Sequence, residues 1–290
     1  MKFAILAAGE GSRLAEEGIS QPKPLVPLLG EPMIDRLIRI FHTCGAESIT
    51  IITNNLTPLT QEHLRQLQAA DPCLRLIVKT TPSSMHSFYE LMPLLGQGPF
   101  CLTTVDTIFR EEEFRTYIHT FTESVSPSGR AAASSAPASS FPASFFPASG
   151  SVLGGSPAET QPASSPLDGL MAVTDFVDDE KPLWVSTAPD LRITGFHDSQ
   201  EQFAQSAAGT DGISECRFIS GGIYCLTDTA FPTLRRCIES GQSRMRNFQR
   251  ALVSDGLRLK ACPFTKILDV DHAEDIRKAE EFLTANISQA

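Results

Sequence analysis

The 290-residue sequence predicts an α/β fold in which a mostly parallel central sheet has helices on both faces. Apolar runs of strand length alternate along the first half of the chain with amphipathic segments of helical period. Small or polar residues follow three of these runs, at Gly9, Asn54 and Asp106. Because ligands bind at the carboxyl ends of parallel strands, we expect a binding site where these three residues lie.

The first elements follow one another closely along the chain. An apolar run predicts a strand over 3–8, and apolar positions at helical spacing predict a helix over 33–44 that ends at Gly45. The same patterns predict a strand at 48–53, a helix at 60–70, a strand at 74–78, a helix at 85–95 and a strand at 100–105. Strands that alternate with helices in this way pair in parallel.

Residues 124–166 interrupt the alternation. Ser, Ala and Pro occupy 29 of these 43 positions, and the only charged residues are Arg130 and Glu159. Such a segment cannot bury a core, and its prolines stop helices, so a flexible insertion is predicted. Beyond it the patterns predict strands at 168–174, 183–185 and 219–226, a helix at 243–254, a strand at 257–262, an extended segment at 266–271 and a helix at 273–284. We therefore expect a single domain over 1–290 with the insertion inside it.

The composition limits the classes of function. The net charge of −10, with no basic cluster, argues against a surface that binds nucleic acid. An acidic chain can still bind a triphosphate if cations neutralise it, which points to a metal ion. The seven cysteines include no Cys-x-x-Cys pair, so we expect reduced thiols and a cytoplasmic protein. No secretion signal or membrane-spanning segment is recognised, and nothing in the sequence indicates the oligomeric state.

A glycine loop follows the first predicted strand and reads Leu-Ala-Ala-Gly-Glu-Gly-Ser-Arg-Leu over 6–14. Gly9 and Gly11 remove side chains where the chain leaves the strand, so backbone N–H groups can surround phosphate oxygens. Arg13 and Lys23 add positive charges, and a proline on each side of Lys23 stiffens the backbone there. A loop with these features suits a nucleoside triphosphate.

Two other phosphate-binding loops do not fit the sequence. A dinucleotide-binding loop requires a third glycine, where Leu14 stands, and an acidic residue after the second strand, where Asn54 stands. A Walker loop requires Gly-Lys-Ser/Thr, which does not follow Gly11. A plain strand-to-helix glycine turn is the remaining structural alternative.

Together with Pro22-Lys23-Pro24 and the residues that follow it, the loop resembles the N-terminal signature of the sugar-phosphate nucleotidyltransferases. The resemblance implies a Rossmann-like nucleotidyltransferase fold. It also implies transfer of an NMP from an NTP to a phosphorylated sugar or small phosphorylated alcohol, with release of pyrophosphate. The nucleotide-binding residues that it implies in the loop are Leu6, Ala7, Ala8, Gly9, Glu10, Gly11 and Ser12.

In the resembled family, the segment that recognises the nucleobase corresponds to residues 80–88 of this chain. It is similar to members that use choline phosphate or other small phosphorylated alcohols. Ser84 and Ser87 are candidates for hydrogen bonds to a base or phosphate. Ser83 or Ser84 could instead cap the next helix.

The acidic candidates lie far apart in the sequence. Asp106 follows a strand, and Asp269 and Asp271 alternate around Val270, so both face one side of an extended segment. Carboxylates of this kind suit Mg²⁺. The resemblance implies that Asp106 and Asp271 hold Mg²⁺, with Asp269 as a substitute or support. Asp271 could alternatively be the N-cap of the final helix.

The resemblance also implies how the reaction proceeds. A phosphate oxygen of the acceptor attacks the α-phosphorus in line, while Arg13 faces the β- and γ-phosphates and Lys23 faces the α-phosphate and the acceptor. No general base is needed, because the acceptor phosphate is already ionised. The acceptor is expected against Gly221 and Gly222, which permit close backbone approach or form a β-bulge.

Two other functions use the same features. One is a non-catalytic nucleotide-sensing module of the same fold, which the presence of Arg13, Lys23 and Asp106 disfavours. The other is a nucleotidyltransferase of the molybdenum-cofactor type, whose glycine loop is similar.

Overall fold

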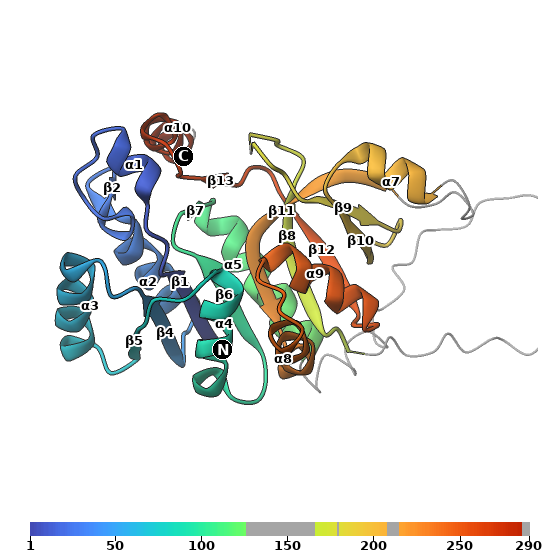
Figure 1. Ribbon diagram of the computed structural model, residues 1–290, viewed down its shortest axis with the longest axis horizontal. Coiled ribbons are helices and arrows are strands. Elements are labelled where there is room, and N and C mark those ends of the chain that lie inside the picture. The colour runs from blue at the N-terminus through green and yellow to red at the C-terminus, as the bar shows by residue number, and fades with distance from the viewer. Residues whose placement is uncertain (126–165, 179, 208–214, 286–290) are drawn as a thin grey trace, which may run out of the picture.

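The computed structural model describes residues 1–125, 166–178, 180–207 and 215–285 (Figure 1). In this part of the chain a nine-stranded sheet has the order β10-β9-β11-β6-β1-β4-β5, with β8 between β11 and β12. Its first half consists of β1 (Lys2–Ala7), β4 (Ser48–Thr53), β5 (Leu74–Val78) and β6 (Phe100–Thr104). These four strands pair in parallel, so their carboxyl ends meet at one edge.

The second half of the sheet is built around one long strand. Its strands are β8 (Gly169–Thr174), β9 (Trp184–Thr187), β10 (Ile193–His197), β11 (Glu215–Leu226) and β12 (Leu259–Phe264). β11 runs antiparallel to β6, β8 and β9, and its register against β8 shifts between Ser220 and Tyr224. The β-bulge expected as one alternative for Gly221 and Gly222 is therefore present.

Helices cover both faces of the sheet (Figure 1). One face packs against α4 (Ser84–Leu95), α8 (Phe231–Glu239) and α9 (Met245–Ser254), and the other against α2 (Met33–Thr43), α3 (Pro58–Ala70) and α5 (Glu111–Val125). Alternate residues of β1 serve the two cores, because Ala4 and Leu6 join the first and Phe3 and Ile5 the second.

A third apolar cluster joins the two ends of the chain. It contains Leu14 of α1 (Ser12–Glu16), Ile108 of β7 (Thr107–Ile108) and Phe282 of α10 (Ala273–Thr284). β7 pairs antiparallel with β13 (Leu268–Asp269), which brings the C-terminal aspartates next to the end of β6. Figure 1 shows α10 beside α1 accordingly.

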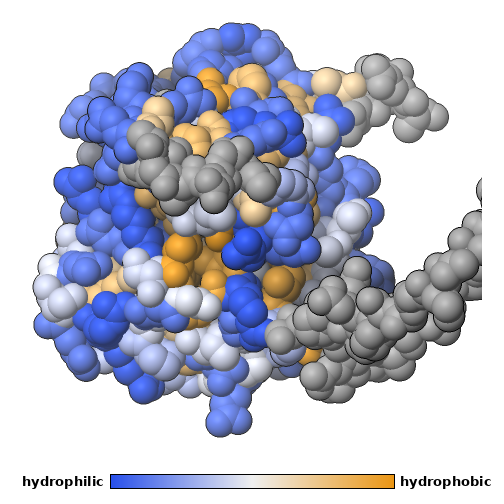
Figure 2. Space-filling model, turned by 90° about the vertical axis from the view of Figure 1, so that its right-hand side faces the viewer, coloured by the Kyte–Doolittle hydropathy of each residue, from blue (hydrophilic) through white to orange (hydrophobic). Residues whose placement is uncertain are grey.

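The remaining elements of the fold are short. They are the 3₁₀ turns η1 (Lys23–Leu25) and η2 (Asp228–Ala230), the hairpin strands β2 (Pro27–Leu28) and β3 (Glu31–Pro32), and helix α7 (Gln200–Ala207). Figure 2 shows the face on the α7 side of the molecule, where hydrophobic residues gather in a central hollow with hydrophilic residues around it. All seven cysteines are free thiols. Among the described helices, none has the length and apolar character that crossing a bilayer requires.

The structure confirms the predicted fold class, and most predicted elements have their bounds within two residues of the observed ones. Helices α5, α7 and α8 and strand β10 were not predicted. α5 continues to Val125, which corrects the start of the predicted insertion, and residues 126–165 of that insertion lie outside the described residues. The single-domain prediction stays a prediction.

Candidate active site

The glycine loop connects β1 to α1 at the sheet edge where the parallel strands end. Gly11 has φ +63°, and a Cβ there would lie 2.9 Å from the Lys23 Cβ, so glycine serves both the turn and the close approach of η1. A Cβ at Gly9 would meet no atom within 4 Å, because Gly9 lines an open cavity. The two glycines therefore have different effects. The missing side chain of Gly11 allows Lys23 to pack against the loop, and the missing side chain of Gly9 leaves the cavity open.

Four charged residues predicted from the sequence meet next to this loop. The Lys23 side chain is nearly buried, and its Nζ lies 2.6 Å from Oδ1 of Asp271 and forms a second ion pair with Asp106. Nη1 of Arg13 lies 3.0 Å from Oδ2 of Asp271. α1 (Ser12–Glu16), η1 (Lys23–Leu25), the end of β6 and the segment after β13 thus bring together residues up to 258 positions apart.

The electrostatics of the cluster favour the charged forms of Lys23 and Asp271. Burial lowers the pKa of Lys23, but the carboxylates of Asp106 and Asp271 outweigh it, and the net shift is upward. Burial raises the pKa of Asp271, but Lys23 and Arg13 outweigh it, and the net shift is downward. The cluster thus contains two basic and two acidic side chains in direct contact.

This arrangement fits a hydrated magnesium ion. Asp106 and Asp271 contact the same ammonium group, so their carboxylates face a common position for a cation. In the part of the chain that the structure describes, no group of three or more His, Cys, Asp or Glu side chains could hold a metal ion. Two carboxylates alone suit Mg²⁺, which keeps several waters and takes further oxygens from phosphate.

The N-cap of α10 is His272, not Asp271. The carboxylate of Asp275 accepts hydrogen bonds from the backbone N–H groups of Asp271 (3.2 Å) and His272 (2.9 Å). The N-cap hypothesis for Asp271 is therefore wrong. The Asp271 carboxylate instead forms ion pairs with Lys23 and Arg13. Asp269 is 3.4 Å from the Thr107 hydroxyl and does not line the cavity of Asp106 and Lys23.

That cavity has a volume of about 520 Å³. Its lining includes most of the predicted nucleotide-binding and charged residues, which are Leu6, Ala8, Gly9, Glu10, Gly11, Ser12, Arg13, Lys23, Ser84, Ser87, Asp106 and Asp271. Ala7 is the exception, because its side chain points into the core of the other face of the sheet. We call this space the nucleotide cavity.

Three serines border the nucleotide cavity at the start of α4. Ser83 is the N-cap, and its Oγ accepts a hydrogen bond from the N–H of His86. The capping hypothesis is therefore confirmed for Ser83 and wrong for Ser84. Ser87 is buried, and its hydroxyl lies 2.6 Å from that of Thr81.

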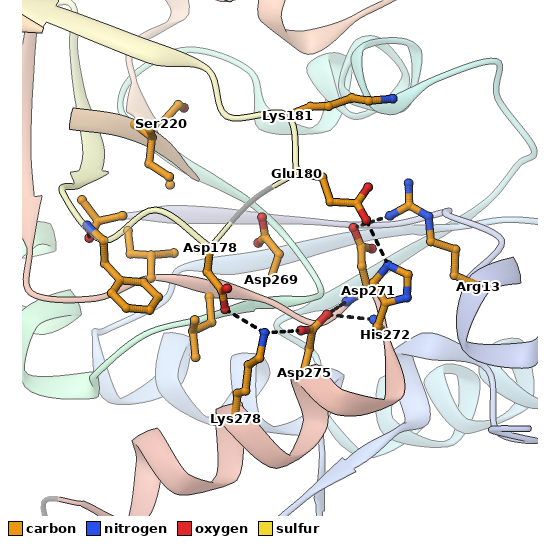
Figure 3. Close-up of a pocket in the computed structure, with 16 residues that line it drawn as sticks. Arg13, Asp178, Glu180, Lys181, Ser220, Asp269, Asp271, His272, Asp275 and Lys278 are labelled. Atoms are coloured by element: carbon orange, nitrogen blue, oxygen red, sulfur yellow. Dashed lines mark hydrogen bonds and ion pairs between the residues drawn. The ribbon is translucent and has the colours of Figure 1, made fainter. Parts of the chain in front are cut away.

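A second cavity of about 290 Å³ adjoins the first and shares Arg13 and Asp271 with it (Figure 3). Gly221 lines it, and a Cβ on this residue would lie 2.2 Å from Cδ1 of Ile267. Gly222 does not line it; with φ +71° it forms the bulge that turns β11. The structure thus places one predicted acceptor residue in a cavity wall and the other behind it.

Acidic side chains outnumber basic ones in this second cavity, which we call the acceptor cavity. Among the described residues its carboxylates are Asp178, Glu180, Asp269, Asp271 and Asp275, and its basic side chains are Arg13, Lys181, Lys278 and His272, whose pKa is raised. Figure 3 shows Lys278 between Asp178 and Asp275, with Nζ to carboxylate distances of 3.0 and 3.3 Å. Asp178, Glu180, Lys181, Asp275 and Lys278 were not predicted as site residues. Asp178 and Glu180 belong to an acidic run after the strand over 168–174, which is the signal that could have indicated them.

Comparisons with known proteins identify the family of the chain. The family described as the MobA-like NTP transferase domain matches residues 3–252, so the match ends before Asp271. A 2-aminoethylphosphonate cytidylyltransferase of Lancefieldella rimae is 30% identical over 111 residues, which cover 37% of this chain and 44% of that protein. An N-acetylmuramate α-1-phosphate uridylyltransferase of Caulobacter vibrioides is 26% identical over 111 residues, which cover 37% of this chain and 46% of that protein.

The match to these two curated relatives thus spans less than half of their length. A solved structure of an inositol-1-phosphate CTP transferase from T. maritima has the same fold, with a TM-score of 0.62 at 13% identity over 98% of this chain and 96% of that one. The family match covers most of the residues and includes the glycine loop, Lys23 and Asp106. The chain belongs to the MobA-like NTP transferase domain family.

Proposed function

We propose that the chain is a magnesium-dependent nucleotidyltransferase. It transfers an NMP from an NTP to a small phosphorylated or phosphonylated acceptor and releases pyrophosphate. The observation that carries this proposal is the meeting of Arg13, Lys23, Asp106 and Asp271 where the nucleotide and acceptor cavities adjoin. The relatives named as cytidylyl- and uridylyltransferases support it.

In this reaction an oxygen of the acceptor phosphate or phosphonate forms a bond to the α-phosphorus. The bond from the α-phosphorus to the bridging oxygen of the β-phosphate breaks, and pyrophosphate leaves. Lys23 and Arg13 stabilise the negative charge on the oxygens around these bonds. Lys23 lines the nucleotide cavity, and Arg13 lines both cavities. The attacking group is ionised, so no side chain has to remove a proton.

Asp106 and Asp271 would hold the Mg²⁺, which supplies further neutralisation of the polyphosphate when it is bound. Until then Lys23 balances the two carboxylates. We therefore expect EDTA to abolish pyrophosphate release and added Mg²⁺ to restore it.

For the acceptor, the excess of carboxylates in the acceptor cavity favours a compound that carries a positive charge. A relative acts on 2-aminoethylphosphonate, by its name, and such an acceptor pairs an ammonium group with the reacting phosphonate. We propose an aminoalkyl phosphonate or a phosphate ester with a cationic group, such as choline phosphate, ahead of a sugar phosphate that has no cationic group.

A pyrophosphate-release screen tests both proposals. Each of the four NTPs is combined with 2-aminoethylphosphonate, choline phosphate, inositol 1-phosphate and glucose 1-phosphate in the presence of Mg²⁺. Turnover of any pair establishes nucleotidyltransferase activity, and preference for the acceptors with a cationic group establishes the class of acceptor. If calorimetry detects NTP binding but no pair releases pyrophosphate, the nucleotide-sensing module is the better explanation.

A further inference from the structure

Asn54 follows β4 and is fully buried beside the glycine loop. Its Nδ2 donates hydrogen bonds to the carbonyl oxygens of Ala8 (3.1 Å) and Gly9 (3.2 Å). Its Oδ1 accepts hydrogen bonds from the N–H of Leu56 (2.9 Å) and the hydroxyl of Thr57 (3.0 Å). Both donors and both acceptor positions of this amide are therefore used.

These bonds fix the direction of the peptide groups in the loop. In a planar trans peptide the carbonyl and the following N–H point in opposite directions. Because the carbonyls of Ala8 and Gly9 point at Asn54, the N–H groups of Gly9 and Glu10 point away from it. Both of these residues line the nucleotide cavity. A glycine at position 9 would otherwise leave the loop free to adopt many conformations.

We propose that Asn54 is a positioning residue for nucleotide binding: it fixes two backbone N–H groups of the glycine loop for the phosphates. This inference rests on the proposed function. A purely structural role is also available to Asn54, because its Oδ1 closes a local turn with Leu56. The two roles use different atoms of the same amide, so substitutions can separate them.

The test variant is Asn54→Ser. The shorter, uncharged hydroxyl can still close a turn with Leu56, but it cannot reach both loop carbonyls. The matched control is Thr57→Val, which removes a hydrogen bond to Asn54 Oδ1 and leaves the bonds to Ala8 and Gly9 intact. Each protein is titrated by calorimetry with ATP, CTP, GTP and UTP in Mg²⁺, and KM is measured for both substrates.

We expect Asn54→Ser to weaken binding of the best NTP at least tenfold and to raise its KM, with the acceptor KM within twofold of wild type. Thr57→Val should bind within twofold of wild type. If Asn54→Ser binds NTP as tightly as wild type, or if both variants lose affinity equally, the inference is overturned and the proposed function is unaffected. A wild-type protein that neither binds NTP nor releases pyrophosphate would overturn both.

If Asn54→Ser does not fold, Asn54→Asp replaces it. The carboxylate keeps the size of the side chain and the acceptor for Leu56 but loses the donor atoms. The amide chemical shifts of Gly9 and Glu10, measured by NMR with and without NTP, are then the second measurement. Loss of the NTP-induced shift changes there, with unchanged amide shifts in β5, supports the positioning role, and wild-type shift changes at Gly9 and Glu10 contradict it.

Discussion

The ammonium group of Lys23 stands where two facing carboxylates require a cation. It is nearly buried between Asp106 and Asp271, and Gly11 lacks the side chain that would exclude it. Removing this lysine would leave two carboxylates facing each other next to a cavity proposed for a polyanion. A single side chain thus connects the charge balance of the site to its proposed chemistry.

For Lys23→Met we expect kcat to fall by about a hundredfold or more, because a positive charge at the reacting phosphates is lost. The matched control is Lys2→Met at the other end of β1, where Nζ donates to the carbonyls of Leu95 and Gln97. Its kcat should stay within twofold of wild type even if its melting temperature falls. A Lys23→Met enzyme with near-normal kcat would contradict the assigned role.

Gly221 offers a test of the acceptor cavity. A Cβ there would lie 2.2 Å from Cδ1 of Ile267, so Gly221→Ala should cost about 1–3 kcal/mol of stability and raise the KM for the acceptor. Ile267→Val removes the Cδ1 atom, so the double variant should recover most of both losses. Thermal melts and acceptor titrations measure this. A double variant no better than Gly221→Ala would show that the clash does not decide the effect.

At the level of helices and strands, the junction between α1 and α10 closes the site. Nδ1 of His272 lies 2.6 Å from the Glu17 carboxylate, which also accepts the N–H of Ala273 at 2.6 Å. The hydrogen bond to Glu17 raises the pKa of His272 above 6.5. The pKa of Glu17 is lowered, first by the Ala273 amide and then by His272. A charged pair therefore holds the start of α10 next to Asp271.

This pair makes the stability of the junction depend on pH. Because folding raises the pKa of His272, its contribution is complete below pH 6.5 and is lost as pH rises through the higher folded value. The difference in melting temperature between wild type and His272→Gln should therefore be largest between pH 4.5 and 6.5, where Glu17 is ionised and His272 is protonated, and should shrink at alkaline pH. Glu17→Gln should keep part of its loss at alkaline pH, because Glu17 also accepts the N–H of Ala273. A difference between wild type and His272→Gln that grows with pH would contradict the assignment.

The elements that the sequence predicted are those with a strong local pattern. The strands over 48–53 and 74–78 and the helix over 273–284 have their observed bounds. α5 has apolar residues at helical spacing, with Phe114, Tyr117 and Phe121 buried, so its signal was present but overlooked. The first residues of β11 differ from α5 in this respect. They form a strand through their pairing with β9, which the local sequence pattern did not indicate.

The same distinction applies to the site. Arg13, Lys23 and Asp106 belong to motifs or strand ends that can be read locally, and the structure brings them together. The acidic wall of the acceptor cavity could not be assembled in this way. Asp178 and Lys278 are 100 positions apart and meet only because α10 packs there. Asn54 was recognised as a strand-end residue, but its hydrogen bonds to the loop depend on the β1–β4 register.

Across the molecule, contacts on either side of the predicted insertion hold the fold together. The hydroxyl of Tyr117 in α5 donates to the carbonyl of Leu170 in β8 (2.5 Å) and accepts from the N–H of Cys225 in β11 (2.8 Å). These bonds connect the chain before residue 126 to the chain after residue 165. The sheet therefore has its own fixed geometry on both sides of the Ser/Ala/Pro-rich segment.

We therefore expect that replacing 126–165 by a flexible Gly/Ser linker changes the melting temperature by no more than about 2 °C and leaves the rate of pyrophosphate release unchanged. The reason is the composition of the segment, which is unsuited to core packing. Calorimetry and the pyrophosphate assay measure the two quantities. A drop of several degrees would show that the segment contributes to the folded structure.

Because β13 pairs with β7, the charged cluster depends on residues from both ends of the described chain. Glycine loop, Lys23 and Asp106 are synthesised early, but Asp271 is delivered by a strand near the C-terminus, beyond the part that the family match covers. A fragment that ends at residue 252, where the family match ends, would lack Asp271, so Lys23 would have at most one of its two carboxylate partners.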